Sequence, residues 1–413
     1  MTEKINLPNG ARLITEYMEH MRSAAVGFWV KSGSRHEPEG LGGISHAIEH
    51  MVFKGTKKRT VVQIAEEMDA IGGHVNAFTT KECTCFYGRS LDSHLDSAID
   101  LLTDLFFSPK LAEEDWQTER KVILEEIDMY EDSPEDLVGE ELFSAAFKGC
   151  PLGRPVLGKP ESLNAINAEM ISGYMAENYT AGRMVVSLVG HYSGKDRDKL
   201  IDILSPVGGE TPADTASGTY MSAFTAKHKQ IEQNHICLGF QSLPLGHKDR
   251  YALQILNGIL GAGMSSRLFQ TVREKNGLCY SIYSYTSAHA DTGLFGIYTA
   301  LNKDTEIQAI KLIREIVQDF ADAGSTQHEL DRAREQIKAN VLMSLESTSA
   351  RMNHLGQSEL LMKYVPTPDE ITERYDAVTC DEVRALAGEI FDFGRISFSA
   401  VGNVDGTDYR ALF

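Results

Sequence analysis

The second half of the chain repeats a pattern of the first half, 212 residues further on. A Gly-Phe pair inside an apolar stretch begins at Gly27 and recurs at Gly239. The apolar run that ends at Gly190 recurs in the run that ends at Gly402, with the same offset. Because the offset is constant at both ends of a half, the sequence predicts a duplicated domain.

Each half mixes strand-like stretches with helical ones. The first half shows strand patterns at 24–32, 73–90 and 183–190, and helical patterns at 60–71, 93–107, 112–131 and 163–178. The helix at 112–131 has a counterpart near 327–345. We therefore expect an α+β fold of two homologous domains, each a mixed β-sheet flanked by helices.

The boundary between the two domains is predicted from composition. Residues 205–219 are rich in Gly, Pro, Ser, Thr and Ala, which is typical of a linker. We expect a first domain at 1–204 and a second at 220–413.

The first domain contains His46, Glu49 and His50 in the order H-x-x-E-H. On a helix, the two histidines lie one turn apart on one face and can share a metal ion. Glu49 lies close enough to reach a metal-bound water. A catalytic zinc site uses three protein ligands and one open position, so this interpretation requires a third ligand elsewhere in the chain.

The surroundings of the motif favour a metal site over an ordinary solvated helix face. Glycines precede and follow the segment, and apolar residues alternate with polar ones at helical spacing, so the helix is half-buried. An unliganded pair of histidines beside a glutamate is costly there. The repeat places Gly258, Gly261 and Ala262 at the corresponding positions, so the second domain lacks these ligands.

Composition excludes several classes of partner. The net charge of −19 disfavours nucleic acid, which is bound through Lys and Arg. No apolar run reaches the roughly 18 residues that a membrane helix needs, so we expect no membrane. The six cysteines are scattered, and the N-terminal segment has no features of a secretion signal. We read the cysteines as reduced thiols and expect a cytoplasmic protein.

Several further motifs resemble one family. They are GSRHE at 33–37, VNAFT at 75–79, GRPVLG at 153–158 and SSRLFQTVREKNGLCYSIYS at 265–284, together with the H-x-x-E-H segment. With these motifs the chain resembles the pitrilysin-type (inverzincin) zinc peptidases along nearly its whole length. The branch it looks closest to is that of the mitochondrial processing peptidase beta subunit and its bacterial relatives.

The resemblance supplies the third ligand, which the residues alone leave open between Glu125 and Glu126. It implies that Glu126, with the two histidines, holds Zn²⁺, and that Glu49 is the general base. Glu119 lies seven residues before Glu126, on the same side of the expected helix, and would orient a ligand from outside the metal's own shell.

The resemblance also implies residues that bind substrate. Residues 73–79 would form an exposed edge strand, where Asn76, Ala77 and Phe78 contact an extended peptide. Arg273 and Tyr280 match an Arg and a Tyr that complete the active site from the second domain. Tyr280 would donate to the developing oxyanion, and Arg273 would bind the substrate backbone.

Taken together, these expectations describe a zinc-dependent endopeptidase acting on unfolded or presequence-like peptides. Because one chain carries one metal motif and one Arg–Tyr pair, we expect a homodimer. Two alternatives share the same fold. One is a non-catalytic structural subunit like the core subunits of the respiratory cytochrome complex, and the other is a subunit that is active only with a different partner chain.

Overall fold

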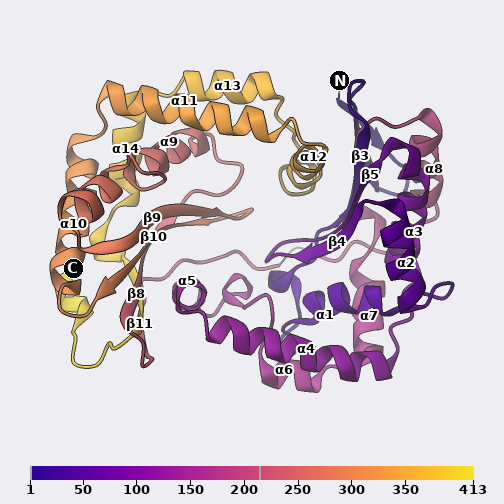
Figure 1. Ribbon diagram of the computed structural model, residues 1–413, viewed down its shortest axis with the longest axis horizontal. Helices are drawn as coiled ribbons and strands as arrows, with labels where there is room; N and C mark the ends of the chain where they lie inside the picture. The colour runs from indigo at the N-terminus through magenta and orange to yellow at the C-terminus, as the bar shows by residue number, and fades with distance from the viewer. Residues whose placement is uncertain (1, 214) are drawn as a thin grey trace. The chain divides into compact units, whose positions relative to one another are not determined.

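The computed structural model describes residues 2–213 and 215–413, which form two compact units. Unit 1 contains the described residues of 1–127, 154–216 and 343–366. Unit 2 contains 128–153, 217–342 and 367–413. Figure 1 shows both units as a sheet with helices packed on it.

Unit 1 is built on a six-stranded sheet in the order β1-β2-β6-β3-β5-β4. Strands β2 and β6 are parallel, and every other neighbouring pair is antiparallel, so the sheet is mixed. The strands are β1 Thr2–Asn6, β2 Arg12–Tyr17, β3 Ser23–Val30, β4 His74–Thr79, β5 Thr84–Leu91 and β6 Met184–Gly190. The helices are α1 Ile44–Met51, α2 Val61–Ile71, α3 Leu95–Phe107, α4 Glu113–Glu131, α6 Pro160–Ala165, α7 Ala168–Asn178, α8 Gly194–Leu204 and α12 Thr348–Met362, and the last residues of α4 belong to unit 2.

Unit 2 repeats the sheet with five strands in the order β7-β11-β8-β10-β9. Strands β7 and β11 are its parallel pair, as β2 and β6 are in unit 1. The strands are β7 Phe224–His228, β8 Gln233–Ser242, β9 Cys279–Ala288, β10 Gly293–Asn302 and β11 Ser397–Gly402. The helices are α5 Pro134–Ala146, α9 Arg250–Leu260, α10 Glu306–Ala323, α11 Gln327–Ser344, α13 Pro368–Asp376 and α14 Cys380–Ile390, with the end of α11 in unit 1. The predicted fold class of two homologous mixed-sheet domains is confirmed.

Each sheet is covered on one face by a helix from the other half of the sequence. Helix α5 precedes the linker but packs on β8 and β11, and α12 follows it but packs on β3 and β6. The repeated glycines make this packing possible. A Cβ at Gly27 would collide with the sulfur of Met352, and a Cβ at Gly239 would press on Leu142. The Gly-Phe repeat therefore marks a strand position that the exchanged helix approaches closely.

Strand β3 is buried on both faces. Its alternate residues Val26 and Phe28 belong to the core shared with α1 and α3, whereas Trp29 belongs to the core shared with α12. Because successive side chains of a strand point to opposite faces, one apolar strand fills both cores.

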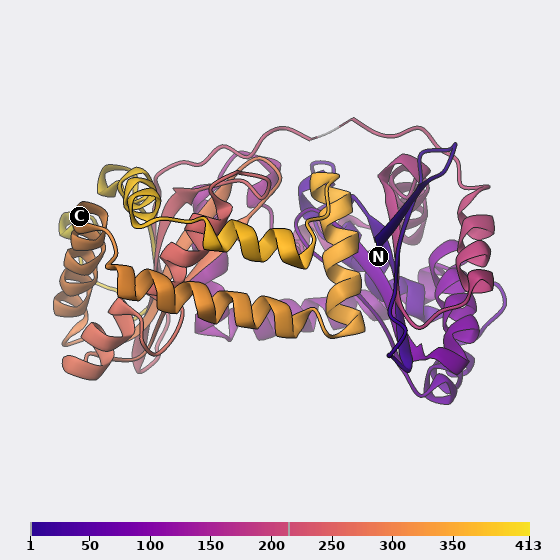
Figure 2. The ribbon, with the colours of Figure 1, turned by 90° about the horizontal axis from the view of Figure 1, so that it is seen from above.

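The predicted linker at 205–219 has neither helix nor strand among its described residues (Figure 2). Arg183 donates hydrogen bonds to the carbonyls of Pro212 and Ala213, and Arg35 donates to that of Ala216. The predicted boundaries treat 1–204 and 220–413 as consecutive halves, whereas each compact unit also includes a helix from the other half.

One expected helix differs from the prediction. The pattern at 163–178 predicts a single helix, but the chain forms α6 and α7 with a break at Ile166 and Asn167. Asn167 adopts an extended backbone, and its side chain accepts from the N–H of Met170, so it begins a new helix instead of continuing the first.

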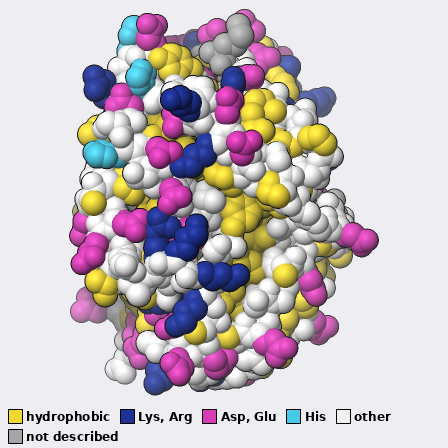
Figure 3. Space-filling view, turned by 90° about the vertical axis from the view of Figure 1, so that its right-hand side faces the viewer, with side chains coloured by type: hydrophobic (Ala, Val, Ile, Leu, Met, Phe, Trp, Pro, Cys, Tyr) yellow, Lys and Arg dark blue, Asp and Glu magenta, His cyan; other side chains and the backbone are white. Residues whose placement is uncertain are grey.

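No helix among the described residues combines the length and apolar character needed to cross a membrane. The face in Figure 3 carries a group of Lys and Arg side chains among Asp and Glu, beside a strip of hydrophobic ones. The net negative charge of the chain is therefore not a uniform acidic layer on this face.

Candidate metal centre

The short helix α1 is anchored at its first turn by a carboxylate from upstream. Gly43 precedes the helix with a φ of 91°, a conformation that favours glycine. The side chain of Glu37 accepts from the N–H of Gly43 at 2.8 Å and of Ser45 at 2.9 Å. These bonds satisfy amide groups that a helix start leaves without partners. Burial raises the pKa of Glu37 to about 7.

The opposite faces of α1 have different surroundings. Ile44, Ile48 and Met51 are buried in the core of unit 1. His46 and His50 lie on the side that meets α4, and their ring centroids are 4.6 Å apart. The helical spacing of the motif thus brings the two imidazoles together.

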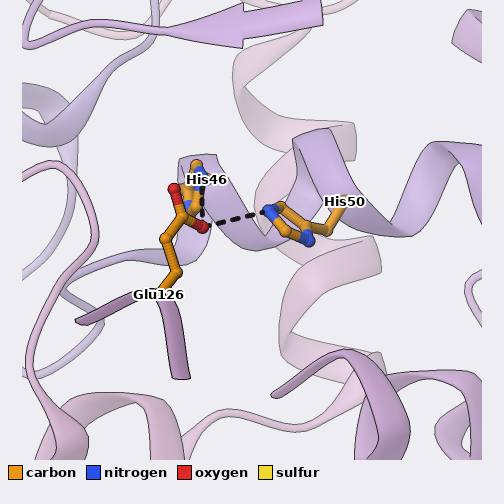
Figure 4. A group of neighbouring side chains, drawn as sticks. All are labelled: His46, His50 and Glu126. Carbon is orange, nitrogen blue, oxygen red and sulfur yellow. Dashed lines mark ion pairs between the residues drawn. The ribbon is translucent and has the colours of Figure 1, made fainter. Parts of the chain in front are cut away.

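Helix α4 brings Glu126 to this pair (Figure 4). Its Oε2 lies 3.7 Å from His46 Nε2 and 3.6 Å from His50 Nε2. One donor atom from each of the three residues lies within 4.8 Å of the others, and the described residues contain no second such group of three or more His, Cys, Asp or Glu. Glu125, the alternative ligand, is exposed.

The two separations that Glu126 makes with the histidines fit zinc, and the separation of the two imidazole nitrogens is within 4.8 Å. In a tetrahedral site with bonds of about 2.0–2.1 Å, neighbouring donors lie about 3.3 Å apart, and the 3.6 and 3.7 Å separations approach that value. Two imidazoles and one carboxylate are also a known donor set of catalytic zinc sites.

The two histidines differ in their affinity for protons. Burial, with repulsion from His50, lowers the pKa of His46 to about 4. Burial also acts to lower the pKa of His50, but its contacts with the carboxylates of Glu126 and Glu119 outweigh burial and raise it. His46 therefore offers a neutral ring nitrogen at neutral pH, whereas the two carboxylates favour the protonated form of His50.

Glu119 lies on the far side of the His50 ring. Its Oε2 is 3.1 Å from His50 Nδ1, and the residue is only 5% exposed. A carboxylate at Nδ1 fixes the proton there and leaves Nε2 free to bind a metal, so Glu119 has the geometry of the orienting carboxylate predicted for it.

Glu49 lies on the same helix, and burial raises the pKa of its carboxyl group. Polar groups of Thr79, at the end of β4, lie near this side chain and act to lower its pKa, but burial outweighs them. Its Oε2 is buried and has no partner among the described residues. One carboxylate oxygen is thus available to take a proton. Thr79 had no role in the sequence prediction, because the contact joins a strand end to a distant helix.

Strand β4 forms one edge of the sheet beside α1. Asn76 is exposed, and its Oδ1 accepts from the backbone N–H of Ala77 at 2.9 Å. Phe78 instead packs against Trp29 on the face opposite to α1. The side chain of Phe78 is half-buried there.

Arg273 and Tyr280 lie together in unit 2. The guanidinium of Arg273 lies 4.8 Å from the centroid of the Tyr280 ring and 4.6 Å from that of Phe269. Tyr280 is 74% exposed. The metal-centre residues belong to unit 1, whereas Arg273 and Tyr280 belong to unit 2.

Comparison with known proteins gives a consistent result. Residues 12–160 match the model of "Insulinase (Peptidase family M16)", and residues 165–337 match "Peptidase M16 inactive domain". The uncharacterized zinc protease YmxG of Bacillus subtilis is 40% identical over 98% of this chain and 100% of its own length. A relative from Streptomyces coelicolor, also named an uncharacterized zinc protease, is 38% identical over 97% of this chain and 89% of its own.

Solved structures share the fold at low sequence identity. A peptidase M16 inactive domain from Pseudomonas fluorescens superposes with a TM-score of 0.90 at 20% identity, covering 97% of this chain and 98% of that one. A protease from Helicobacter pylori gives 0.89 at 22% identity, covering 97% and 99%.

Proposed function

Because the chain belongs to the M16 (insulinase, pitrilysin-type) family of zinc peptidases, we propose that it is a zinc-dependent endopeptidase whose metal is held by His46, His50 and Glu126. The observation that supports this most is the convergence of one donor atom from each residue within 4.8 Å.

The chemistry divides between the metal and the chain. Zinc in such a site supplies a water of lowered pKa and polarises the substrate carbonyl. Glu49 takes the proton of the water through its unpartnered Oε2 and later delivers it to the leaving amine. Thr79, at the end of β4, lies near the Glu49 carboxyl group. The raised pKa of Glu49 suits a group that must both accept and return a proton.

The substrates we propose are unfolded or presequence-like peptides. An extended peptide can add to the free edge of β4 through backbone hydrogen bonds, which a folded protein cannot offer. Asn76 would then release the N–H of Ala77, which its own side chain now occupies. Arg273 would bind the substrate backbone, and the exposed hydroxyl of Tyr280 would donate to the oxyanion.

We further propose a cytoplasmic homodimer. The location rests on six cysteines that are all free thiols. The dimer rests on the single metal group and single Arg–Tyr pair per chain. Mixing E49Q chains with Y280F chains tests it, because a site completed by the second copy regains activity in the mixture. A monomeric protein with full activity contradicts the dimer.

The decisive test of the enzymatic proposal is E49Q in a peptide-library digest with zinc analysis. It should keep zinc and lose cleavage by about 100-fold or more, because a general base contributes about that much. E125Q changes an exposed glutamate on α4 and serves as the matched control, with activity unchanged. Wild-type protein that binds zinc but cleaves no peptide favours the alternative of a non-catalytic or partner-dependent subunit.

A further inference from the structure

At the metal centre a row of nitrogen-bearing side chains on α1 and its continuation faces a row of carboxylates on α4. His46, His50 and Lys54 follow one another at intervals of four residues, along α1 and the short 3₁₀ turn Val52–Lys54 that continues it. Glu119 and Glu126 lie seven residues apart on α4. Glu126 contacts both imidazoles, and Glu119 contacts His50 and Lys54.

Glu119 is held at both of its oxygens. Oε2 lies 3.1 Å from His50 Nδ1, and Oε1 lies 2.5 Å from Lys54 Nζ. The Glu119 side chain is 7% exposed, whereas that of Lys54 is 32% exposed. The Lys54 ammonium therefore approaches from the half-exposed side and binds Oε1, the Glu119 oxygen that does not contact the imidazole. A carboxylate held at both ends has a fixed orientation toward the ring.

The other imidazole has no such support. His46 Nδ1 is buried without a hydrogen-bond partner among the described residues. Control of ring orientation from outside the metal's own ligands is therefore concentrated on His50, and it depends on the orientation of one carboxylate.

We propose that Lys54 is a positioning residue of the zinc centre. Its ammonium fixes the Glu119 carboxylate, which in turn holds the His50 proton on Nδ1 and turns Nε2 toward the metal. This inference deepens the proposed function, on which its zinc readout rests, and it assigns Lys54 no contact with substrate or metal.

The first test measures zinc affinity of the full-length K54M protein by competition with a chelator. Methionine keeps the aliphatic stem and removes the ammonium. Loss of an outer partner of a metal ligand weakens binding by about 10–100-fold, and we expect about 10-fold for this more remote group. The matched control is K57M, which removes an exposed lysine three residues later and should leave the affinity unchanged.

Two further measurements separate positioning from general stabilisation. If Lys54 acts only through Glu119, the double variant K54M/E119Q binds zinc no more weakly than E119Q alone. In metal-free protein, at a pH high enough for the His50 ring to be neutral, ¹⁵N NMR of His50 should show the Nδ1–H tautomer in the wild type and a mixture in K54M. Should K54M not fold, K54Q replaces it with the same expectations.

The outcomes are distinct. Unchanged affinity and an unchanged His50 tautomer in K54M overturn the role of Lys54, as does an additive loss in the double variant. Wild-type protein that binds no zinc contradicts the proposed function instead, and the tautomer of the metal-free protein still decides the role of Lys54.

Discussion

Helix α1 of unit 1 and helix α9 of unit 2 occupy corresponding places in the repeat but carry different side chains. In unit 1 the eight-residue α1 carries two histidines on the side that faces α4, and Glu49 between them in the sequence. In unit 2 glycine stands at two of the three corresponding positions, Gly258 within the eleven-residue α9 and Gly261 directly after it, and the buried residues of α9 are Ala, Leu and Ile. A Cβ at Gly261 would lie 2.5 Å from the backbone nitrogen of Ser284, so the space beside this helix is closed.

The difference extends to the neighbouring helix. The repeat places Lys338 of α11 where α4 has Glu126, and Lys338 forms an ion pair with Asp376 at 2.7 Å. Gly258 of α9 lies against Ala333 and Ile337 of α11. The comparison teaches that the same arrangement of sheet and helices accommodates either a cluster of metal-ligating side chains or a direct apolar contact between two helices. A few side chains decide which of the two forms.

The largest expected effect is on zinc binding, and it separates Glu126 of α4 from its counterpart Lys338 of α11. E126Q removes a ligand and should weaken zinc binding by more than about 100-fold, beyond the loss typical of outer partners. K338M changes the equivalent position of unit 2 and should leave zinc binding as it is. Chelator competition on both variants checks the prediction, and equal effects would erase the distinction between the units.

The start of the helix offers a second comparison. Glu37 reaches from upstream to the first turn of α1, whereas α9 begins directly after Asp249. Burial raises the Glu37 pKa from 4.5 to about 7, so the folded state holds this proton more tightly than the unfolded chain. Its contribution to stability is complete below pH 4.5 and is lost as pH rises through 7, by at most about 3 kcal/mol.

E37Q removes this titration. Urea denaturation between pH 5 and 8 should therefore show a smaller loss of stability with rising pH in E37Q than in the wild type. E39Q, two residues later and exposed, is the control and should keep the wild-type slope. Parallel slopes for wild type and E37Q would show that Glu37 does not titrate in this range.

A smaller effect is expected from filling the closed space of unit 2. G261A adds a Cβ that must displace Ser284, and we expect a destabilisation of about 2 kcal/mol, as for overpacked cores. Gly246 has no neighbouring atom near its would-be Cβ, so G246A is the control. The shift in the urea midpoint measures both. A neutral G261A would mean that the contact of α9 is looser than the packing indicates.

Part of this arrangement was accessible from sequence. The offset of the repeat predicted two mixed-sheet domains, and the spacing of His46 and His50 placed them on one helix face. The structure brings Glu126 to them, but the residues alone did not separate it from Glu125. That choice needed the family resemblance, because a helix pattern does not say which of two adjacent carboxylates turns inward.

The remainder depends on contacts between distant segments. The exchange of α5 and α12 has no local signal, since each helix has an ordinary pattern. The glycines at 27 and 239 are explained only by the helices that pack against them, which are distant in the sequence. Glu37 is remote from the helix it anchors. Lys54 does continue the four-residue spacing of the histidines, and that signal was available.

The central claim is one zinc ion per chain, held in unit 1 by two imidazoles and one carboxylate. Metal analysis with X-ray absorption on the purified wild type tests it most directly. The account predicts one zinc per chain with two imidazole ligands and oxygen donors, and its loss in H50A. Zinc retained in H50A, or a sulfur ligand in the zinc spectrum, would contradict it.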